Sequence, residues 1–220
     1  MAQPPDQFTF SPAVHPLTAS PAAFQALYPH VTDFMTGIVV FRTSPTLQAL
    51  VVRRAANDSH PLHWETPGGG IDATDASVLS AAARELWEET GLVAQHFHAP
   101  VLVSPMPDFS TPEGQALKKS FSLDPESKES VDTIDMDGLG LSFTEPGRRW
   151  GKVAVLADAV DTAAVTIRPD EHDRWAWITE EEATSGKFAS GETLGFVAVG
   201  VMQTVVEGFR IKKALLAAEQ

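Results

Sequence analysis

The chain of 220 residues contains no cysteine. Disulfides, thiolate nucleophiles and cysteine-based zinc sites are therefore excluded. The amino-terminal stretch MAQPPDQFTF has no basic start and no continuous apolar run, so it is unlike a secretory signal. The most apolar late stretch, residues 194–206, is too short to span a bilayer, which takes about 20 apolar residues. These absences lead us to expect a cytoplasmic protein with no membrane partner.

Basic residues are also scarce, with 16 Lys and Arg against 29 Asp and Glu, for a formal net charge of −13. No basic stripe offsets this charge, and an acidic surface repels nucleic-acid backbones, so we expect no nucleic-acid partner. Most of the charge serves solubility. A substrate that carries phosphate would need bound cations or a few well-placed arginines in order to approach such a surface.

Composition and patterning divide the chain into an amino-terminal arm at residues 1–35 and one domain at residues 36–220. The arm is rich in Pro and Ala; we expect it to pack on the domain and to contain a short helix at 21–27. Apolar and β-branched runs predict strands at 37–41, 47–53, 63–65, 92–104, 150–158 and 174–178. Thr179 and Glu182 have the spacing of a capping box, and a long final helix is predicted at 193–218.

Residues 105–149 differ from their surroundings, because they contain five prolines, many Ser, Asp and Glu, and little periodicity. A connection of this length is unusual inside a compact domain. We therefore predict an inserted lid or a flexible loop at about 105–149.

The segment that carries chemistry is a helix predicted at about 76–90, directly after three consecutive glycines. Thr74 or Asp75 can cap its start, and Gly91 stands where a helix C-terminal glycine belongs. At about 100° per residue, the apolar residues and Thr90 fall on one face, which is expected to face the core. This core face consists of Leu79, Ala82, Ala83, Leu86 and Thr90.

Glu85, Glu88 and Glu89 stand at positions i, i+3 and i+4 and share a different face of this helix. Arg84 lies four residues before Glu88, where the two side chains can pair. Like charges at this spacing destabilise a helix by a few tenths of a kcal/mol each, about 0.2–0.5. Near a helix C-terminus they also oppose the macrodipole. Clustered hard oxygen ligands suit Mg²⁺ or Mn²⁺. The alternative is a solvated acidic face, and the helix alone does not decide between the two.

The glycines before the helix favour the metal site, because they let the backbone turn tightly and approach a ligand closely. With them, the stretch resembles the signature of Nudix hydrolases: a glycine, a spaced glutamate, then Arg-Glu-hydrophobic-x-Glu-Glu-x-Gly-hydrophobic. Residues Arg84 to Leu92 match the second half at every position. The entry Trp64-Glu65-x-Pro-Gly-Gly and the pair Trp177-Ile178 before a capped helix also fit this family.

The resemblance implies a Nudix-type α/β/α sandwich with a mixed β-sheet between helices. It also implies a hydrolase, dependent on Mg²⁺ or Mn²⁺, that cleaves a phosphoanhydride (diphosphate) bond in a small molecule. The substrate class is a nucleoside diphosphate linked to another group, such as a nucleotide sugar, ADP-ribose or a dinucleoside polyphosphate. The sequence does not choose among these, because specificity lies in loops outside the signature.

Carried over by position, the resemblance makes Glu85, Glu88 and Glu89 metal ligands, together with a backbone carbonyl of Gly69 or Gly70. It assigns catalytic roles to Arg84, Glu88 and Glu89, with Glu88 or Glu89 as the base. A second acidic group often comes from a later loop, and Glu171 is the candidate here, although an ordinary loop carboxylate is an equal reading.

One position departs from the signature. Eight residues before Arg84, where the family has a glutamate that pairs with the arginine and braces the loop, this chain has Ala76. Asp75 or Asp72 could replace it. The departure and the insertion motivate an alternative function, a Nudix-fold protein diverted to ligand sensing or to non-hydrolytic small-molecule chemistry.

Two further arginine pairs are candidates for binding the substrate phosphates. Arg53 and Arg54 end a strand, where they could contact phosphate or remain exposed strand-end charges. Arg148 and Arg149, with Trp150, end the insertion and could form a cationic, aromatic wall over a substrate. The oligomeric state stays open, a homodimer included.

Overall fold

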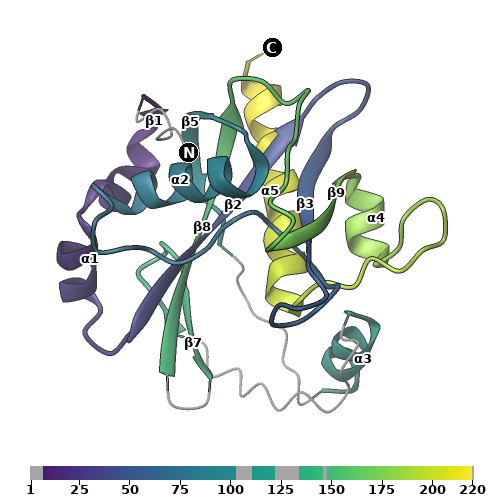
Figure 1. Cartoon of the computed structure of the whole chain (residues 1–220), viewed down its shortest axis with the longest axis horizontal. Coiled ribbons are helices and arrows are strands. Elements are labelled where there is room, and N and C mark those ends of the chain that lie inside the picture. The colour runs from purple at the N-terminus through teal and green to yellow at the C-terminus, as the bar shows by residue number, and fades with distance from the viewer. Residues whose placement is uncertain (1–6, 103–110, 122–133, 146–147, 220) are drawn as a thin grey trace. The chain divides into compact units, whose positions relative to one another are not determined.

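The computed structural model describes residues 7–102, 111–121, 134–145 and 148–219 (Figure 1). The chain divides into two compact units. Unit 1 takes in residues 1–40, 67–102 and 129–168, and unit 2 takes in residues 41–66, 103–128 and 169–220. Helices accompany a mixed β-sheet, which confirms the predicted α/β fold class. Among the described residues, no helix has the length and hydropathy needed to cross a membrane.

The sheet of unit 1 is built around two parallel strands, β2 (Asp33–Arg42) and β8 (Arg148–Ala159). Each contains an unbroken run of buried apolar residues, 38–41 in β2 and 153–157 in β8, a pattern typical of parallel strands. On its other side β8 pairs antiparallel with β5 (Ala94–Pro100), which in turn pairs with the short parallel strand β1 (Thr9–Phe10). Strand β2 begins inside the region predicted as the arm.

The described part of the predicted arm lies within unit 1. It forms a 3-10 helix, η1 (Pro12–Thr18), and helix α1 (Pro21–Leu27), whose bounds equal the predicted 21–27. Ser20 caps α1, because its side chain accepts a hydrogen bond from the Ala23 N–H at 3.3 Å. Phe24 is fully buried and its ring lies 5.0 Å from that of Phe34 on β2.

Helix α2 (Val78–Thr90) carries the carboxylates, and it begins two residues later than predicted. Its cap is Ser77, which accepts a hydrogen bond from the Ser80 N–H at 3.0 Å, rather than Thr74 or Asp75. Gly91 ends the helix in the left-handed conformation, with φ of 68°, as predicted. All five residues of the predicted core face are buried.

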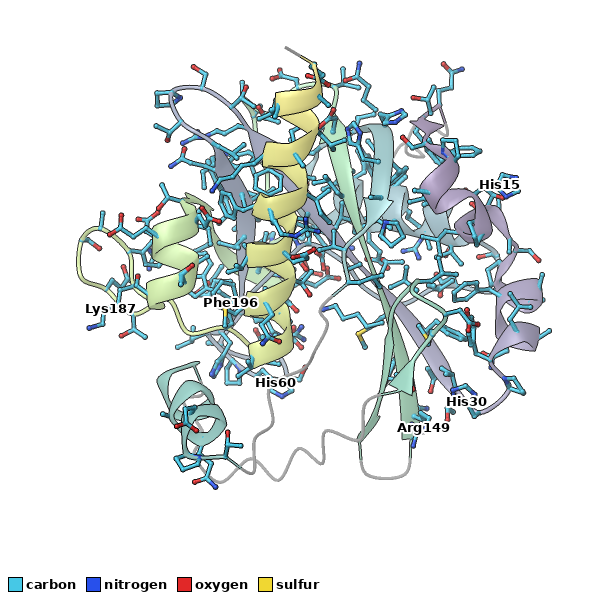
Figure 2. All side chains as sticks on the ribbon, turned by 180° about the vertical axis from the view of Figure 1, so that it is seen from behind. His15, His30, His60, Arg149, Lys187 and Phe196 are labelled. Carbon is cyan, nitrogen blue, oxygen red and sulfur yellow. The ribbon has the colours of Figure 1, made fainter. Side chains whose placement is uncertain are left out.

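Unit 2 contains β3 (Gln48–Arg54), which pairs antiparallel with the last two residues of β2, with β4 (Trp64–Glu65) and with β9 (His172–Ile178). Helix α4 (Glu180–Ser185) begins at the predicted capping box of Thr179 and Glu182. The last helix, α5 (Val199–Ala218), starts six residues later than predicted. The preceding residues extend along β4 instead, with the Trp64 N–H donating to the Gly195 carbonyl at 2.8 Å and buried Phe196 (labelled in Figure 2) opposite Trp64.

The segment predicted as a lid or flexible loop contains regular structure where it is described. Helix α3 (Pro112–Phe121) belongs to unit 2, whereas β6 (Ile134–Asp135) and β7 (Leu141–Glu145) form a hairpin in unit 1. β7 pairs with β8 over five residues, so this part extends the sheet. Asp137 and Gly138 have positive φ angles of 52° and 74°, which allow the tight turn between β6 and β7. The two strands are too short for a periodic pattern to show in the sequence, so the hairpin was not predicted. Residues 105–110, 122–133 and 146–147 of the predicted lid, and residues 103–104 of the strand predicted at 92–104, lie outside the described residues.

Candidate metal site on helix α2

The glycine segment before α2 runs alongside β2 in unit 1. Three backbone hydrogen bonds hold it there: Ile38 N–H to the Pro67 carbonyl at 2.7 Å, Thr36 N–H to Gly69 at 2.8 Å and Ile71 N–H to Phe34 at 3.0 Å. Gly68 has a φ of 151°, and a Cβ on it would lie 2.2 Å from the Thr36 carbonyl oxygen. Only glycine fits this position, because any side chain would separate the segment from the strand.

Glu89 is fixed by this glycine segment. Its Oε2 accepts a hydrogen bond from the Gly68 N–H at 2.8 Å, and the residue is only 6% exposed. Helical periodicity places Glu89 beside Glu85 and Glu88, but it does not show that Glu89 is buried. A buried carboxylate with a backbone donor is oriented before any ligand arrives, which suits a metal ligand.

Glu85 lies against the next glycine. A Cβ on Gly69 would meet the carboxylate of Glu85 at 2.6–2.8 Å, so the missing side chain leaves the space that this carboxylate occupies. The two glycines therefore have different tasks: Gly68 lets the segment join β2, and Gly69 makes room for a candidate metal ligand.

Arg84 brings the remaining groups together. Its Nη1 donates to Glu85 Oε1 at 2.7 Å and to Glu88 Oε2 at 3.1 Å, and its Nη2 donates to the Gly70 carbonyl at 2.9 Å. The pair with Glu88 was predicted from the i, i+4 spacing. Three oxygen atoms that the family resemblance makes candidate metal ligands thus contact one cation. This convergence, together with the space at Gly69, fits the oxygen-rich site that Mg²⁺ or Mn²⁺ requires.

Asp75 is the principal partner of Arg84. Its Oδ1 and Oδ2 accept from Arg84 Nε and Nη2, both at 2.9 Å, whereas Asp72 stands 3.8 Å away. Of the two residues that sequence reasoning offered as substitutes for the missing glutamate at Ala76, the structure selects Asp75. The hydrogen bonds to Asp75 contribute most to raising the pKa of Arg84 far above its usual value, with the charge of Glu85 adding to them against the effect of burial.

Arg148 and Arg149, at the start of β8, make their described contacts away from these carboxylates. Arg148 lies 3.5 Å from Asp33 Oδ2, with its guanidinium over the Trp150 ring at 5.8 Å from the centroid. Arg149, labelled in Figure 2, donates to the Ser142 hydroxyl at 3.4 Å. The guanidinium of Arg148 thus lies over the Trp150 ring, and the wall over a substrate stays a prediction.

The other candidates belong to unit 2. Arg53 donates to both carboxylate oxygens of Asp173, at 2.8 and 2.7 Å. Arg54 donates to Asp58 and to Glu65, both at 2.7 Å. Glu65 entered the sequence analysis only as part of the entry Trp64-Glu65-x-Pro-Gly-Gly, without a role of its own. Both arginines thus have carboxylate partners, and their predicted contact with phosphate stays a prediction. Glu171 accepts the Ala55 N–H through its backbone carbonyl at 2.9 Å, and its predicted role stays a prediction.

The α/β fold, the glycine segment and the carboxylates of α2 together define the class of protein to compare, an α/β protein with a candidate metal site on a helix. The family model described as NUDIX domain matches residues 33–194. The chain therefore belongs to the NUDIX family, as its motif predicts. This match covers most of the chain and includes the whole site on α2.

Individual curated relatives match a shorter stretch of the chain. The phosphatase NudJ of Escherichia coli K12 is 54% identical over 35 residues, which is 16% of this chain and 22% of that protein; NudJ of Shigella flexneri gives the same values. The chain thus matches about a fifth of the length of these curated relatives.

Among solved structures, the MutT protein of Methanosarcina mazei Go1 is 18% identical with a TM-score of 0.47, covering 82% of this chain and 95% of its own. The NUDIX domain of Shewanella oneidensis NrtR, solved with ADP ribose, is 17% identical with a TM-score of 0.49, covering 89% and 99%. At these values the family assignment rests on the domain match.

Proposed function

We propose that the protein is a metal-dependent Nudix pyrophosphohydrolase that cleaves the phosphoanhydride bond of a nucleoside diphosphate linked to another group. The observation that carries the proposal is the convergence of Glu85, Glu88 and the Gly70 carbonyl on a single cation, the guanidinium of Arg84. Membership of the NUDIX family supports it. The carboxylates of Asp75, Glu85, Glu88 and Glu89 outnumber the single positive charge of Arg84. This excess of negatively charged oxygen ligands favours a divalent cation.

Mg²⁺ or Mn²⁺ would be held by Glu85, Glu88 and Glu89, with the carbonyl of Gly69 or Gly70 as a further ligand. When bound, such an ion neutralises charge on phosphate oxygens and lowers the pKa of water in its coordination shell. Glu89 is oriented for this task by the Gly68 N–H. Glu88, which Arg84 holds by one hydrogen bond of 3.1 Å, is the candidate for accepting the proton of the attacking water.

The remaining candidates concern the substrate. Arg148 and Arg149 are proposed to approach its phosphates from the start of β8, and Glu171 is proposed as a second acidic group. Arg53 and Arg54 keep a weaker place in the proposal because each already has a carboxylate partner at 2.7 Å. A cytoplasmic location and a small-molecule partner accompany the proposal.

The alternative function, a Nudix-fold protein without hydrolytic activity, was motivated in part by Ala76. Both carboxylate oxygens of Asp75 accept hydrogen bonds from Arg84, so Arg84 has a partner although position 76 is alanine. Ala76 therefore no longer supports the alternative function. The predicted insertion alone does not favour a ligand sensor over an enzyme.

The test is a panel of nucleotide sugars, ADP-ribose and dinucleoside polyphosphates, each with Mg²⁺ and with Mn²⁺, with released nucleotide or phosphate as the measurement. We expect turnover of at least one diphosphate and none in excess chelator. Full activity in chelator, or binding of metal without turnover of any member of the panel, would contradict the proposal.

A further inference from the structure

The guanidinium of Arg84 presents two groups of donors to different parts of unit 1. The edge formed by Nε and Nη2 faces the carboxylate of Asp75 in a bidentate pair, with both distances at 2.9 Å. Nη1 faces Glu85 and Glu88 on the same helix. Such fork-shaped pairs add geometric specificity as well as energy, so the pair with Asp75 determines where Nη1 points.

Asp75 is itself held in place. Its side chain is only 7% exposed, and its Oδ2 also accepts the Asp72 N–H at 2.8 Å. It stands before the cap of α2, in the loop that links the glycines to the helix. Arg84 therefore ties α2 to this loop twice, through Asp75 and through the Gly70 carbonyl.

We propose that Asp75 is a positioning residue that sets the affinity of the α2 site for divalent metal without contacting the metal. The inference rests on the proposed function only in assuming that Glu85, Glu88 and Glu89 bind such an ion. With Asp75 in place, its carboxylate balances the charge of Arg84. Glu85 and Glu88 can then give up their hydrogen bonds to Nη1 and bind the metal instead. Without Asp75, the whole positive charge is left to Glu85 and Glu88, where it competes with the metal.

Neighbouring residues cannot take over this task in the folded chain. Asp72 is 71% exposed and stands 3.8 Å from Arg84, so it contributes a weak, screened interaction. Ala76 is exposed, and the edge of Arg84 that a carboxylate there would seek is already taken by Asp75. In this chain the carboxylate partner of Arg84 therefore stands at position 75, one residue closer to the glycines than the signature position that Ala76 occupies.

The experiment measures Mn²⁺ affinity by calorimetry without substrate, on the full chain and on Asp75→Asn, with Asp72→Asn as the matched control. Partners that orient metal ligands are typically worth about 10–100-fold in affinity. We expect Asp75→Asn to weaken Mn²⁺ binding at least about tenfold and Asp72→Asn to leave it nearly unchanged. Ala76→Glu is expected to leave it unchanged or to weaken it. Circular dichroism checks that each variant is folded.

The outcomes separate the two proposals. If the unaltered chain binds no Mn²⁺, both proposals are wrong. If it binds Mn²⁺ and folded Asp75→Asn binds equally well, or if Ala76→Glu tightens binding, only the role of Asp75 is wrong. Should Asp75→Asn not fold, the unaltered protein supplies the test by NMR. The Arg84 Nε–H is expected to stay protected from exchange when Mg²⁺ binds, and loss of that protection would overturn the inference.

Discussion

Replacing Gly68 by alanine tests whether the glycine segment positions the site, and Gly70→Ala provides a matched control two residues away. A Cβ on Gly68 would lie 2.2 Å from the Thr36 carbonyl oxygen and 2.8 Å from the Gly37 Cα, both backbone atoms that cannot rotate away. The φ of 151° is also unfavourable for alanine. A Cβ on Gly70 would have nothing within 4 Å.

The magnitude follows from what must move. Separating the segment from β2 by about 1 Å breaks the bonds of Ile38 N–H to Pro67 and Thr36 N–H to Gly69, each worth about 1 kcal/mol. Backbone strain adds about 1–3 kcal/mol. We therefore expect Gly68→Ala to lower the free energy of unfolding by about 3–5 kcal/mol, a large share of a typical total of about 5–15 kcal/mol. Gly70→Ala should stay within about 0.5 kcal/mol.

Urea unfolding followed by circular dichroism measures both variants, and thermal melting should show a decrease in Tm of about 6–20 °C for Gly68→Ala alone. Because Gly68 also supplies the N–H that orients Glu89, metal affinity should fall in any Gly68→Ala protein that remains folded. Equal stability of the two variants would refute the reasoning, since they differ in backbone conformation and in what their Cβ atoms would meet.

Other changes probe the carboxylates directly. Gly69→Ala should cost little stability, because the flexible Glu85 carboxylate can move from the space that the Cβ takes, yet it should weaken Mg²⁺ binding measurably by calorimetry. Glu89→Gln should abolish most turnover but lower the free energy of unfolding by less than about 1 kcal/mol, because the amide oxygen can still accept the Gly68 N–H. Glu89→Ala leaves that N–H without its acceptor and should lower the free energy of unfolding by about 1–3 kcal/mol. Mg²⁺ at about 100 times its Kd should stabilise the fold by about 2.7 kcal/mol, and a Tm unaffected by chelator would argue against the site.

Local patterns predicted much of the structure. The periodicity of residues 79–90 and the position of Gly91 predicted helix α2. The capping box of Thr179 and Glu182 predicted the start of helix α4, and the bounds of α1 were also predicted. These features depend on neighbours three or four residues apart, which a sequence displays directly. The late start of α5 has a tertiary cause, because Phe196 pairs with Trp64, which is far away in the sequence, instead of continuing the helix. The strands within 134–145 pair with each other and with β8, which follows them directly in the chain.

The sequence by itself determined that the chain carries a Nudix signature, with Glu85, Glu88 and Glu89 on one turn of a helix after a run of glycines. Only the tertiary structure decided that Asp75 rather than Asp72 holds Arg84, and that Glu89 is buried against Gly68. It likewise decided that Arg53 pairs with Asp173, 120 residues further along the chain. The physical reason is that such contacts depend on how loops return to a helix or a strand, and hydrogen bonds of about 3 Å distinguish between side chains that sequence spacing treats as equivalent.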